Sequence, residues 1–490
     1  MTPPKIKTLA ALKKSGYTPK SIKEELRDNL LNALKSKENL FEGIHGYDTT
    51  VLPDLKRAIL SKHNLLLLGL RGQAKTRLAR MLVHFLDEYV PYITGSEIND
   101  DPLHPISIYA KDKIEELGDK TPISWLHRDE RYVEKLATPD VSIADLVGDV
   151  DPIKAATLKL PFSDERVIHF GLIPRAHRSI FVLNELPDLQ ARIQVSLFNI
   201  LQEEDLQIRG FKLRLPLDIQ FVFTANPEDY TNRGSIITPL KDRIESQILT
   251  HYPINIEDSA KITLQEARIS PSQLKTIDAT EELVYLIETF VSKARNSEYI
   301  DEKSGVSARL AISAYENLYS TAELRMLINN EKKTQIRVAD LWGIIQSFTG
   351  KAELVYEGEQ KGHHALALEL LNEATKDNFH FLVEDFNKLQ ANRNYKIIYT
   401  YFEAGNSVDL LMNASDKDYK KSLKSIPGLE DLAKEIAPDI TYLYYYMELI
   451  LHGLASIDVI SKAVMVDKVS FGNDLGDLLS DLGGGISFED

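Results

Sequence analysis

The sequence reads Leu65-Leu-Leu-Leu-Gly69-Leu-Arg-Gly72-Gln73-Ala74-Lys75-Thr76 and then continues through Arg77–Leu86. The four leucines predict a short buried strand, and the residues after Thr76 have the apolar spacing of a helix. A glycine-rich turn between a strand and a helix gathers several backbone N–H groups, and the helix adds the positive end of its dipole. This stretch therefore predicts a phosphate-binding loop within an α/β fold.

Each residue type in the loop has an expected task. The side chain of Lys75 would reach the β- and γ-phosphates of ATP, and the hydroxyl of Thr76 would ligate Mg²⁺. Ala74 stands where glycine is usual, so we expect its φ angle to be negative. The residues expected to contact the nucleotide are Gly69, Gly72, Gln73, Ala74, Lys75, Thr76 and Arg77.

A second apolar run ends in an amide and a carboxylate: Ser179-Ile-Phe-Val-Leu-Asn184-Glu185. Asn184 would support Mg²⁺, although an amide lacks the negative charge of the usual aspartate, and Glu185 would polarise the attacking water. The next predicted strand, Ile219–Thr224, leads into Ala225-Asn226-Pro227. Ligands of α/β proteins lie at the carboxyl ends of parallel strands. Asn226 is therefore expected to hold the water opposite Glu185.

The pattern of the 490 residues predicts several domains. A helix is expected from the capping box formed by Ser21 and Glu24, and alternating short apolar runs and amphipathic stretches then predict a parallel sheet flanked by helices. The expected parts are a basic lead and helix (1–40), a nucleotide-binding α/β domain with insertions (41–254), a helical lid (255–350), a mostly helical domain (351–472) and a flexible acidic tail (473–490). The tail is either inert or a docking segment.

Composition excludes several classes of function. The chain has no cysteine, which rules out disulfides and thiolate chemistry, and its formal charge of −15 argues against general nucleic-acid binding. The apolar stretch Thr441–Ile460 is interrupted by Glu448, His452 and Asp458, so a buried helix is expected rather than a membrane span. We expect no membrane insertion and a cytoplasmic location.

Together these motifs resemble one family. The loop with Ala-Lys-Thr, the Asn-Glu strand end, the Thr-Ala-Asn-Pro segment and Leu240-Lys-Asp-Arg243 are similar to the MoxR and magnesium-chelatase I-subunit branch of AAA+ ATPases. Residues 137–154 and 226–243 resemble bacterial magnesium-chelatase-like proteins, and the resemblance is strong from about residue 20 to 315. It implies a P-loop AAA+ core followed by a helical lid.

The resemblance implies further site residues. Arg243 would be the arginine finger that reaches the γ-phosphate bound by a neighbouring subunit, and Arg309 would be the sensor arginine of the lid, which contacts the nucleotide of its own or an adjacent subunit. Gly46 and Tyr47 fall where this family contacts adenine. The 110 residues from Lys75 to Glu185 exceed what two strand–helix–strand units need, which indicates insertions. A hairpin is expected over Glu204–Asp218.

The implied function is that of a ring-forming ATPase, expected to be a hexamer, which uses ATP and Mg²⁺ to remodel or activate a partner protein. In this branch the partner is typically a protein with a von Willebrand A domain. Two alternatives stay open: the motor subunit of a chelatase that inserts Mg into a tetrapyrrole, and a transcriptional activator that contacts sigma factor. Sigma-factor activators carry a Gly-Ala-Phe-Thr-Gly-Ala loop, and the similar string Ser347-Phe-Thr-Gly350 lies in the wrong region.

Overall fold

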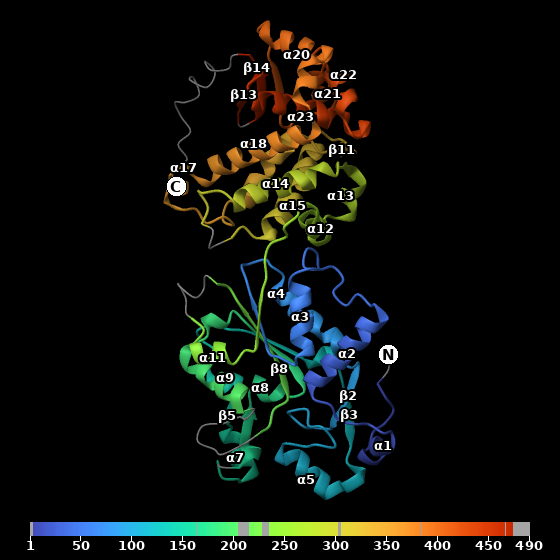
Figure 1. The fold of residues 1–490 in the computed structure, drawn as a ribbon, viewed down its shortest axis with the longest axis vertical. Coiled ribbons are helices and arrows are strands. Elements are labelled where there is room, and N and C mark those ends of the chain that lie inside the picture. The colour runs from blue at the N-terminus through green and yellow to red at the C-terminus, as the bar shows by residue number, and fades with distance from the viewer. Residues whose placement is uncertain are drawn as a thin grey trace. The chain divides into compact units, whose positions relative to one another are not determined.

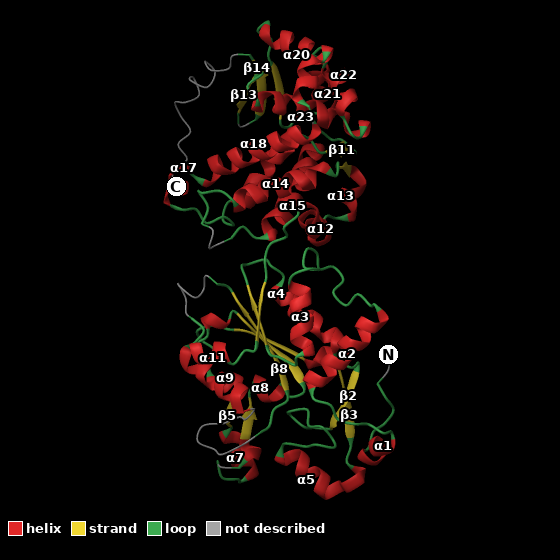
Figure 2. Cartoon of the chain, in the orientation of Figure 1, coloured by secondary structure: helices red, strands yellow, loops and turns green. Residues whose placement is uncertain are grey.

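The computed structural model describes residues 3–162, 164–203, 215–227, 235–301, 305–383, 385–465 and 467–473. The chain forms two compact units, Met1–Tyr252 and Pro253–Asp490. Figure 1 colours them from blue to green and from green to red along the chain, and Figure 2 shows that the long strands lie in the first unit. The predicted acidic tail, apart from its first residue Asn473, and most of the predicted hairpin at 204–218 lie outside the described residues.

The first unit is built on a parallel sheet of five strands in the order β4-β7-β8-β1-β9. The strands are β1 (Leu65–Leu68), β4 (Tyr132–Leu136), β7 (Ser179–Asn184), β8 (Ile219–Ala225) and β9 (Ser246–Leu249). The three strands predicted from apolar runs, β1, β7 and β8, are confirmed within one residue at each end. The predicted fold class, a parallel sheet flanked by helices, is therefore confirmed.

Helices cover both faces of this sheet. One face carries α2 (Ile22–Ser36), α3 (Val51–Leu60) and α4 (Lys75–Met81), and the other carries α8 (Leu172–Arg175), α9 (Ala191–Glu203) and α11 (Thr238–Asp242). Alternate residues of β7 enter opposite cores: Ile180 and Val182 pack on the first face, Phe181 and Leu183 on the second. A strand buried on both faces needs an unbroken apolar run. The predicted capping box of Ser21 and Glu24 is present at the start of α2.

Extra elements occupy the long interval between the phosphate loop and β7. They form two antiparallel pairs, β2 with β3 and β5 with β6. Their bounds, with those of the helices in the same interval, are β2 (Tyr89–Ile93), α5 (Ile108–Leu117), β3 (Ile123–His127), α6 (Ile143–Leu146), β5 (Gly148–Val150), α7 (Pro152–Leu158) and β6 (Ile168–Phe170), whereas α1 (Leu9–Lys14) precedes the loop and is not one of them. They account for the insertions expected before Glu185.

The second unit is mostly helical. Its helices are α12 (Ile256–Glu266), α13 (Pro271–Thr276), α14 (Glu282–Arg295), α15 (Ala308–Ile328), α16 (Ile345–Phe348), α17 (Tyr356–Lys361), α18 (His363–Leu382), α19 (Phe386–Ala391), α20 (Arg393–Glu403), α21 (Asp416–Lys424), α22 (Leu429–Ile436) and α23 (Leu443–Ser456). It also contains strands that the sequence analysis did not predict. An antiparallel sheet has the order β12 (Val408–Leu411), β14 (Lys468–Gly472), β13 (Ser461–Val464), and β10 (Ile277–Asp278) pairs with β11 (Thr334–Gln335).

The apolar stretch near residue 450 forms the buried helix α23, as predicted. Its interrupting side chain Glu448 is fully buried and accepts hydrogen bonds from the backbone N–H groups of Val338 and Ala339 and from the hydroxyl of Tyr419. Burial raises the pKa of Glu448 to about 7 and lowers the pKa of the neighbouring His452. Within the described ranges, no helix combines the length and apolar character needed to cross a membrane.

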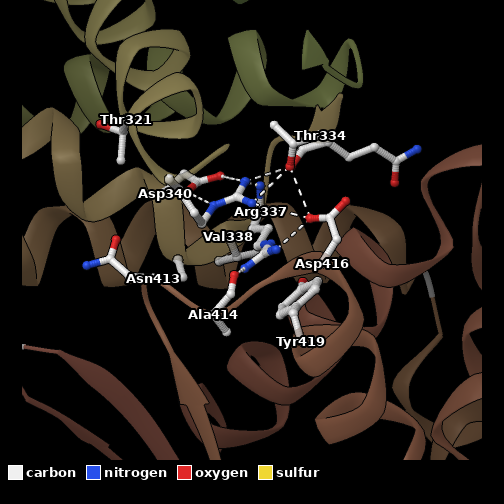
Figure 3. A network of polar contacts seen from close by, with 12 residues as sticks. Thr321, Thr334, Arg337, Val338, Asp340, Asn413, Ala414, Asp416 and Tyr419 are labelled. Carbon is white, nitrogen blue, oxygen red and sulfur yellow. Dashed lines mark hydrogen bonds and ion pairs between the residues drawn. The ribbon is translucent and has the colours of Figure 1, made fainter. Parts of the chain in front are cut away.

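A network of charged groups joins α15 to the first residue of α21, Asp416 (Figure 3). Arg325 pairs with Asp340 at 2.8 Å, and Arg337 pairs with Asp416 at 2.6 Å. The hydroxyl of Thr334 donates to the same Asp416 carboxylate at 3.1 Å. The network thereby ties residues near 330 to residues near 416 within the second unit.

Candidate functional site

The phosphate loop forms the turn between β1 and α4. The N–H of Gly69 donates to the carbonyl of Ala225 at 3.1 Å, which ties the start of the loop to β8. A side chain at Gly69 would collide with Thr250 and Gln73, so only glycine fits there. Gly72 has a φ of 75°, in the left-handed region that favours glycine. Gly69 thus allows the close approach of Thr250 and Gln73, and Gly72 allows a left-handed turn.

The expectation for Ala74 was wrong. Its φ is +55° where a negative angle was expected, because the chain makes a left-handed turn at the residue that directly precedes α4. An L-residue with a β-carbon pays about 1 kcal/mol or more in that region. The methyl group of Ala74 packs at the edge of the core between α3, α4 and the sheet, which offsets part of this strain.

The two polar side chains at the start of α4 point to different partners. The ammonium of Lys75 is nearly buried and donates to the carbonyl oxygens of Gly69 and Leu70, the latter at 2.9 Å. The hydroxyl of Thr76 lies 3.5 Å from the side-chain oxygen of Asn184. The loop therefore has its lysine over its own backbone and its threonine against the end of β7. The neighbouring Arg77 is half-buried.

Three side chains from outside the loop form hydrogen bonds with it, two with its backbone and one with the side chain of Gln73. The hydroxyl of Tyr47 lies 2.9 Å from the carbonyl oxygen of Gln73 and 2.8 Å from that of His251. Thr250 donates to the side-chain oxygen of Gln73 at 2.7 Å, and Tyr252 donates to the carbonyl of Arg71 at 2.9 Å. The sequence analysis did not single out Thr250 or Tyr252.

Gly46 and Tyr47, the pair expected to contact adenine, lie next to the phosphate loop, and Tyr47 contacts it at Gln73. The ring of Tyr47 is 4% exposed and meets the ring of His251 edge-on. Gly46, directly before it, has a φ of 76°. The contacts of Tyr47 thus make it a support of the phosphate loop, while its expected role toward adenine stays a prediction.

The polar residues that follow β7 and β8 share the carboxyl edge of the sheet with the loop. Because β7, β8 and β1 are consecutive neighbours, Glu185, Asn226 and Gly69 follow adjacent strands. Glu185 has a φ of +55°, and its N–H donates to the hydroxyl of Thr224 at 3.2 Å. Asn226 is 1% exposed. A carboxylate on a left-handed residue at such an edge is the kind of local strain that marks functional sites.

Asn184 lies between the loop and the neighbouring strands. Its side-chain oxygen accepts from Thr224 at 3.0 Å and faces Thr76, while its amide nitrogen donates to Glu134 at 2.6 Å. Sequence reasoning missed Glu134, since nothing in its local pattern marks it. The hydroxyl and amide oxygens that converge here are hard donors of the kind that Mg²⁺ takes, usually together with phosphate oxygens and water. The donor set therefore fits a magnesium ion held with a nucleotide, although no cluster of three acidic, histidine or cysteine side chains occurs among the residues described.

The two arginines implied by the family resemblance lie apart from the loop in the chain. Arg243 is the C-cap residue of α11, is paired with Asp242 at 2.7 Å and lies 5.6 Å over the ring of Phe198. Its side chain is 41% exposed. Arg309 is the second residue of α15 in the other unit and is exposed as well. Both side chains are accessible to a neighbouring molecule.

Comparison with known proteins gives one family match and several similar structures. The model of the Sigma-54 interaction domain, an AAA+ domain, matches residues 159–248, which include β7 and β8. Among solved structures, a putative ATPase from Cytophaga hutchinsonii is 15% identical with a TM-score of 0.29, over 74% of this chain and 97% of that one. A complex of the BchI and BchD subunits of magnesium chelatase is 16% identical with a TM-score of 0.34, over 65% and 97%. NtrX from Brucella abortus in complex with ATP is 14% identical with a TM-score of 0.34, over 81% and 72%.

The solved structures are too distant to bear on function. The family match falls on the strands that carry Asn184, Glu185 and Asn226. With the parallel sheet, its helices on both faces and the mostly helical second unit, it shows that the fold is of the P-loop AAA+ α/β type.

Proposed function

We propose that this chain is a Mg²⁺-dependent AAA+ ATPase that assembles into a hexameric ring and remodels or activates a partner protein. The observation that supports hydrolysis is the meeting of the phosphate loop, Asn184-Glu185 and Asn226 at the carboxyl ends of β1, β7 and β8. Ligands of open parallel sheets bind at this edge.

Each residue of the proposed site would then have a role in binding the nucleotide or in proton transfer. The loop from Gly69 to Thr76 would hold the phosphates through its backbone N–H groups, with Lys75 on the β- and γ-phosphates. Thr76 and Asn184 would hold Mg²⁺, which when bound neutralises charge on the phosphate oxygens. Glu185 would take a proton from the attacking water, and Asn226 would orient that water.

The proposal that the chain forms a ring is based on Arg243 and Arg309. Both are exposed. Arg243 would reach the γ-phosphate bound by a neighbouring subunit, and Arg309 would contact the nucleotide of its own or an adjacent subunit. The partner class, a protein with a von Willebrand A domain, follows from the resemblance to the MoxR and magnesium-chelatase branch. The same branch supports the alternative of a motor subunit that drives the insertion of Mg into a tetrapyrrole held by another subunit.

One observation favours the third candidate, an activator that contacts sigma factor: the matched family is the Sigma-54 interaction domain. Sigma-factor activators carry a Gly-Ala-Phe-Thr-Gly-Ala loop, and this string occurs nowhere in the 490 residues. The match itself begins at Lys159-Leu-Pro-Phe-Ser-Asp164. The match also covers the strands that any AAA+ ATPase needs for hydrolysis. We therefore place this function behind partner remodelling.

The affinity of the Lys75→Ala variant for nucleotide tests whether the phosphate loop binds ATP. The wild-type chain should bind a fluorescent ATP analogue in the presence of Mg²⁺, and the variant should bind it at least tenfold more weakly, since it loses a charged contact to phosphate. Lys62→Ala, an exposed lysine paired with Glu24, is the matched control and should bind normally. A wild-type chain that binds no ATP would refute the proposal.

A pull-down with the Glu185→Gln variant and ATP distinguishes the partner classes. Capture of a von Willebrand A protein supports remodelling, and capture of a tetrapyrrole-binding subunit supports the chelatase motor. Capture of sigma factor instead would overturn the first choice.

A further inference from the structure

Asn184 is held at both ends of its side chain. Its amide nitrogen donates to Oε1 of Glu134 at 2.6 Å, and its oxygen accepts from Thr224 at 3.0 Å and lies 3.5 Å from the hydroxyl of Thr76. A carboxylate only accepts hydrogen bonds, so it decides which way an amide is turned. Glu134 therefore makes the nitrogen of Asn184 face β4 and its oxygen face Thr76.

Glu134 is itself held by α4. Both Nε and Nη2 of Arg80 donate to Oε2 of Glu134, at 3.1 and 3.0 Å, and the hydroxyl of Tyr132 donates to the same oxygen at 3.1 Å. The hydrogen bond and the charge of Glu134 raise the pKa of Arg80 above its usual range. Arg80 lies one helical turn after Thr76, so both project from the same side of α4. Thr76, Asn184, Glu134 and Arg80 thus form a closed chain of contacts that returns to the helix where it began.

Glu134 also places a negative charge beside Asn184. The side chain of Glu134 is only 22% exposed, and its Oε1 contacts the amide directly. Aspartate is usual where Asn184 stands, and an amide brings no charge of its own to a cation. A carboxylate one strand away can replace part of that charge, since groups behind the ligands tune the affinity of metal sites.

We propose that Glu134 is a positioning residue for the ATP hydrolysis proposed above, on which this inference rests. It turns the oxygen of Asn184 toward Thr76 and supplies from β4 the negative charge that the amide lacks. The carboxylate of this pair therefore belongs to Glu134 on β4 and the amide to Asn184 on β7, where a carboxylate on β7 is usual.

This arrangement reverses the simple expectation for Asn184→Asp. Adding a carboxylate next to a cation should strengthen cation binding, but here the new carboxylate would lie within hydrogen-bonding distance of Glu134. An aspartate has no N–H to donate, so Oε1 of Glu134 would face a second acceptor, and the hydrogen bond that turns residue 184 toward Thr76 would be lost. Asn184→Asp alone should therefore weaken the site, whereas adding Glu134→Gln restores one amide, one carboxylate and the hydrogen bond between them.

The test compares the wild type with Glu134→Gln, Asn184→Asp and the double variant. Two quantities are measured: the free Mg²⁺ that gives half-maximal ATP hydrolysis, and the gain in affinity for a fluorescent ATP analogue when Mg²⁺ replaces EDTA. Each single variant should raise the half-saturating Mg²⁺ about tenfold, and the double variant should return to within about threefold of the wild type. Affinity in EDTA should be the same in all four proteins, because the phosphate loop is untouched.

Glu130→Gln is the matched control, since it makes the same chemical change at an exposed glutamate two residues before β4. It should leave both quantities unchanged. The inference is overturned if Glu134→Gln keeps the wild-type magnesium dependence, or if the double variant is no better than the worse single one. A wild-type chain that neither binds nor hydrolyses ATP would instead refute the proposed function itself.

Discussion

Replacing Arg325 with methionine should destabilise the second unit by about 3 kcal/mol. The guanidinium of Arg325 is 1% exposed and forms a two-pronged pair with Asp340, with Nε–Oδ1 at 3.0 Å and Nη2–Oδ2 at 2.8 Å. It also donates to the hydroxyl of Thr334 and to the carbonyl of Gln335, both at 2.9 Å. Figure 3 labels Asp340 and Thr334, two of the side chains to which the bonds of this network run.

The magnitude follows from what the substitution leaves behind. Removing one partner of a buried ion pair costs about 3–5 kcal/mol, because the other charge stays buried without compensation. Asp340 is 2% exposed but keeps a 2.8 Å hydrogen bond from the backbone N–H of Arg337. We therefore expect the lower end of that range, which corresponds to a fall in melting temperature of roughly 6–12 °C for a unit of this size.

The assay uses the fluorescence of Trp342, which packs between the two cores of the second unit. The chain has two tryptophans, so urea denaturation in a Trp125→Phe background reports on the second unit alone. Lys293→Met is the control, because its pair with Asp377 is partly exposed and should contribute less than about 1 kcal/mol. If Arg325→Met costs no more than this control, the network does not stabilise the unit as we describe.

Three further predictions concern assembly, backbone strain and pH. Arg243→Ala should keep ATP binding but abolish the rise of hydrolysis per subunit with protein concentration; a wild-type rate that is independent of concentration in a monomeric preparation would contradict the role in trans. Ala74→Gly removes the strain of a φ of +55° and should change the unfolding free energy of the first unit by less than about 1 kcal/mol, whereas Ala74→Val should cost more than that; equal effects of the two substitutions in thermal melts would count against the strain. Burial raises the pKa of Asp218 to about 6 from an ordinary value of 3.8. The stability that the protonated Asp218 carboxyl contributes is therefore fully present below pH 3.8 and is lost as the pH rises through 6. Asp218→Asn should therefore be more stable than the wild type at pH 8, by about 2–3 kcal/mol, and lose that advantage near pH 4; a difference that does not change with pH would refute this.

The parts of the site that could be predicted from sequence are those whose signals are local. Four leucines, a glycine-rich turn and Lys75-Thr76 lie within twelve residues, so the order of strand, turn and helix could be predicted there, although the left-handed φ of Ala74 could not. The apolar runs of β7 and β8 are similarly self-contained, because a strand buried on both faces needs nothing but apolar residues.

The parts that were missed depend on contacts between distant residues. Thr250 and Tyr252 support a loop about 180 residues earlier, and Glu134 meets Asn184 only because β4 and β7 are neighbours in the sheet. The strands β12, β13 and β14 are four or five residues long, and β12 pairs with β14 across some 60 residues. Nothing in the local periodicity of such short segments reveals their partners.

The most direct test of the central claim is the rate of ATP hydrolysis by Glu185→Gln at saturating Mg²⁺ and ATP. If Glu185 takes the proton from the attacking water, the amide should bind ATP within about threefold of the wild type and hydrolyse it at least tenfold more slowly. Glu130→Gln, the same change at an exposed glutamate, should hydrolyse ATP at the wild-type rate. Near-normal turnover by Glu185→Gln would contradict the assignment of the carboxyl edge of this sheet as the site of hydrolysis.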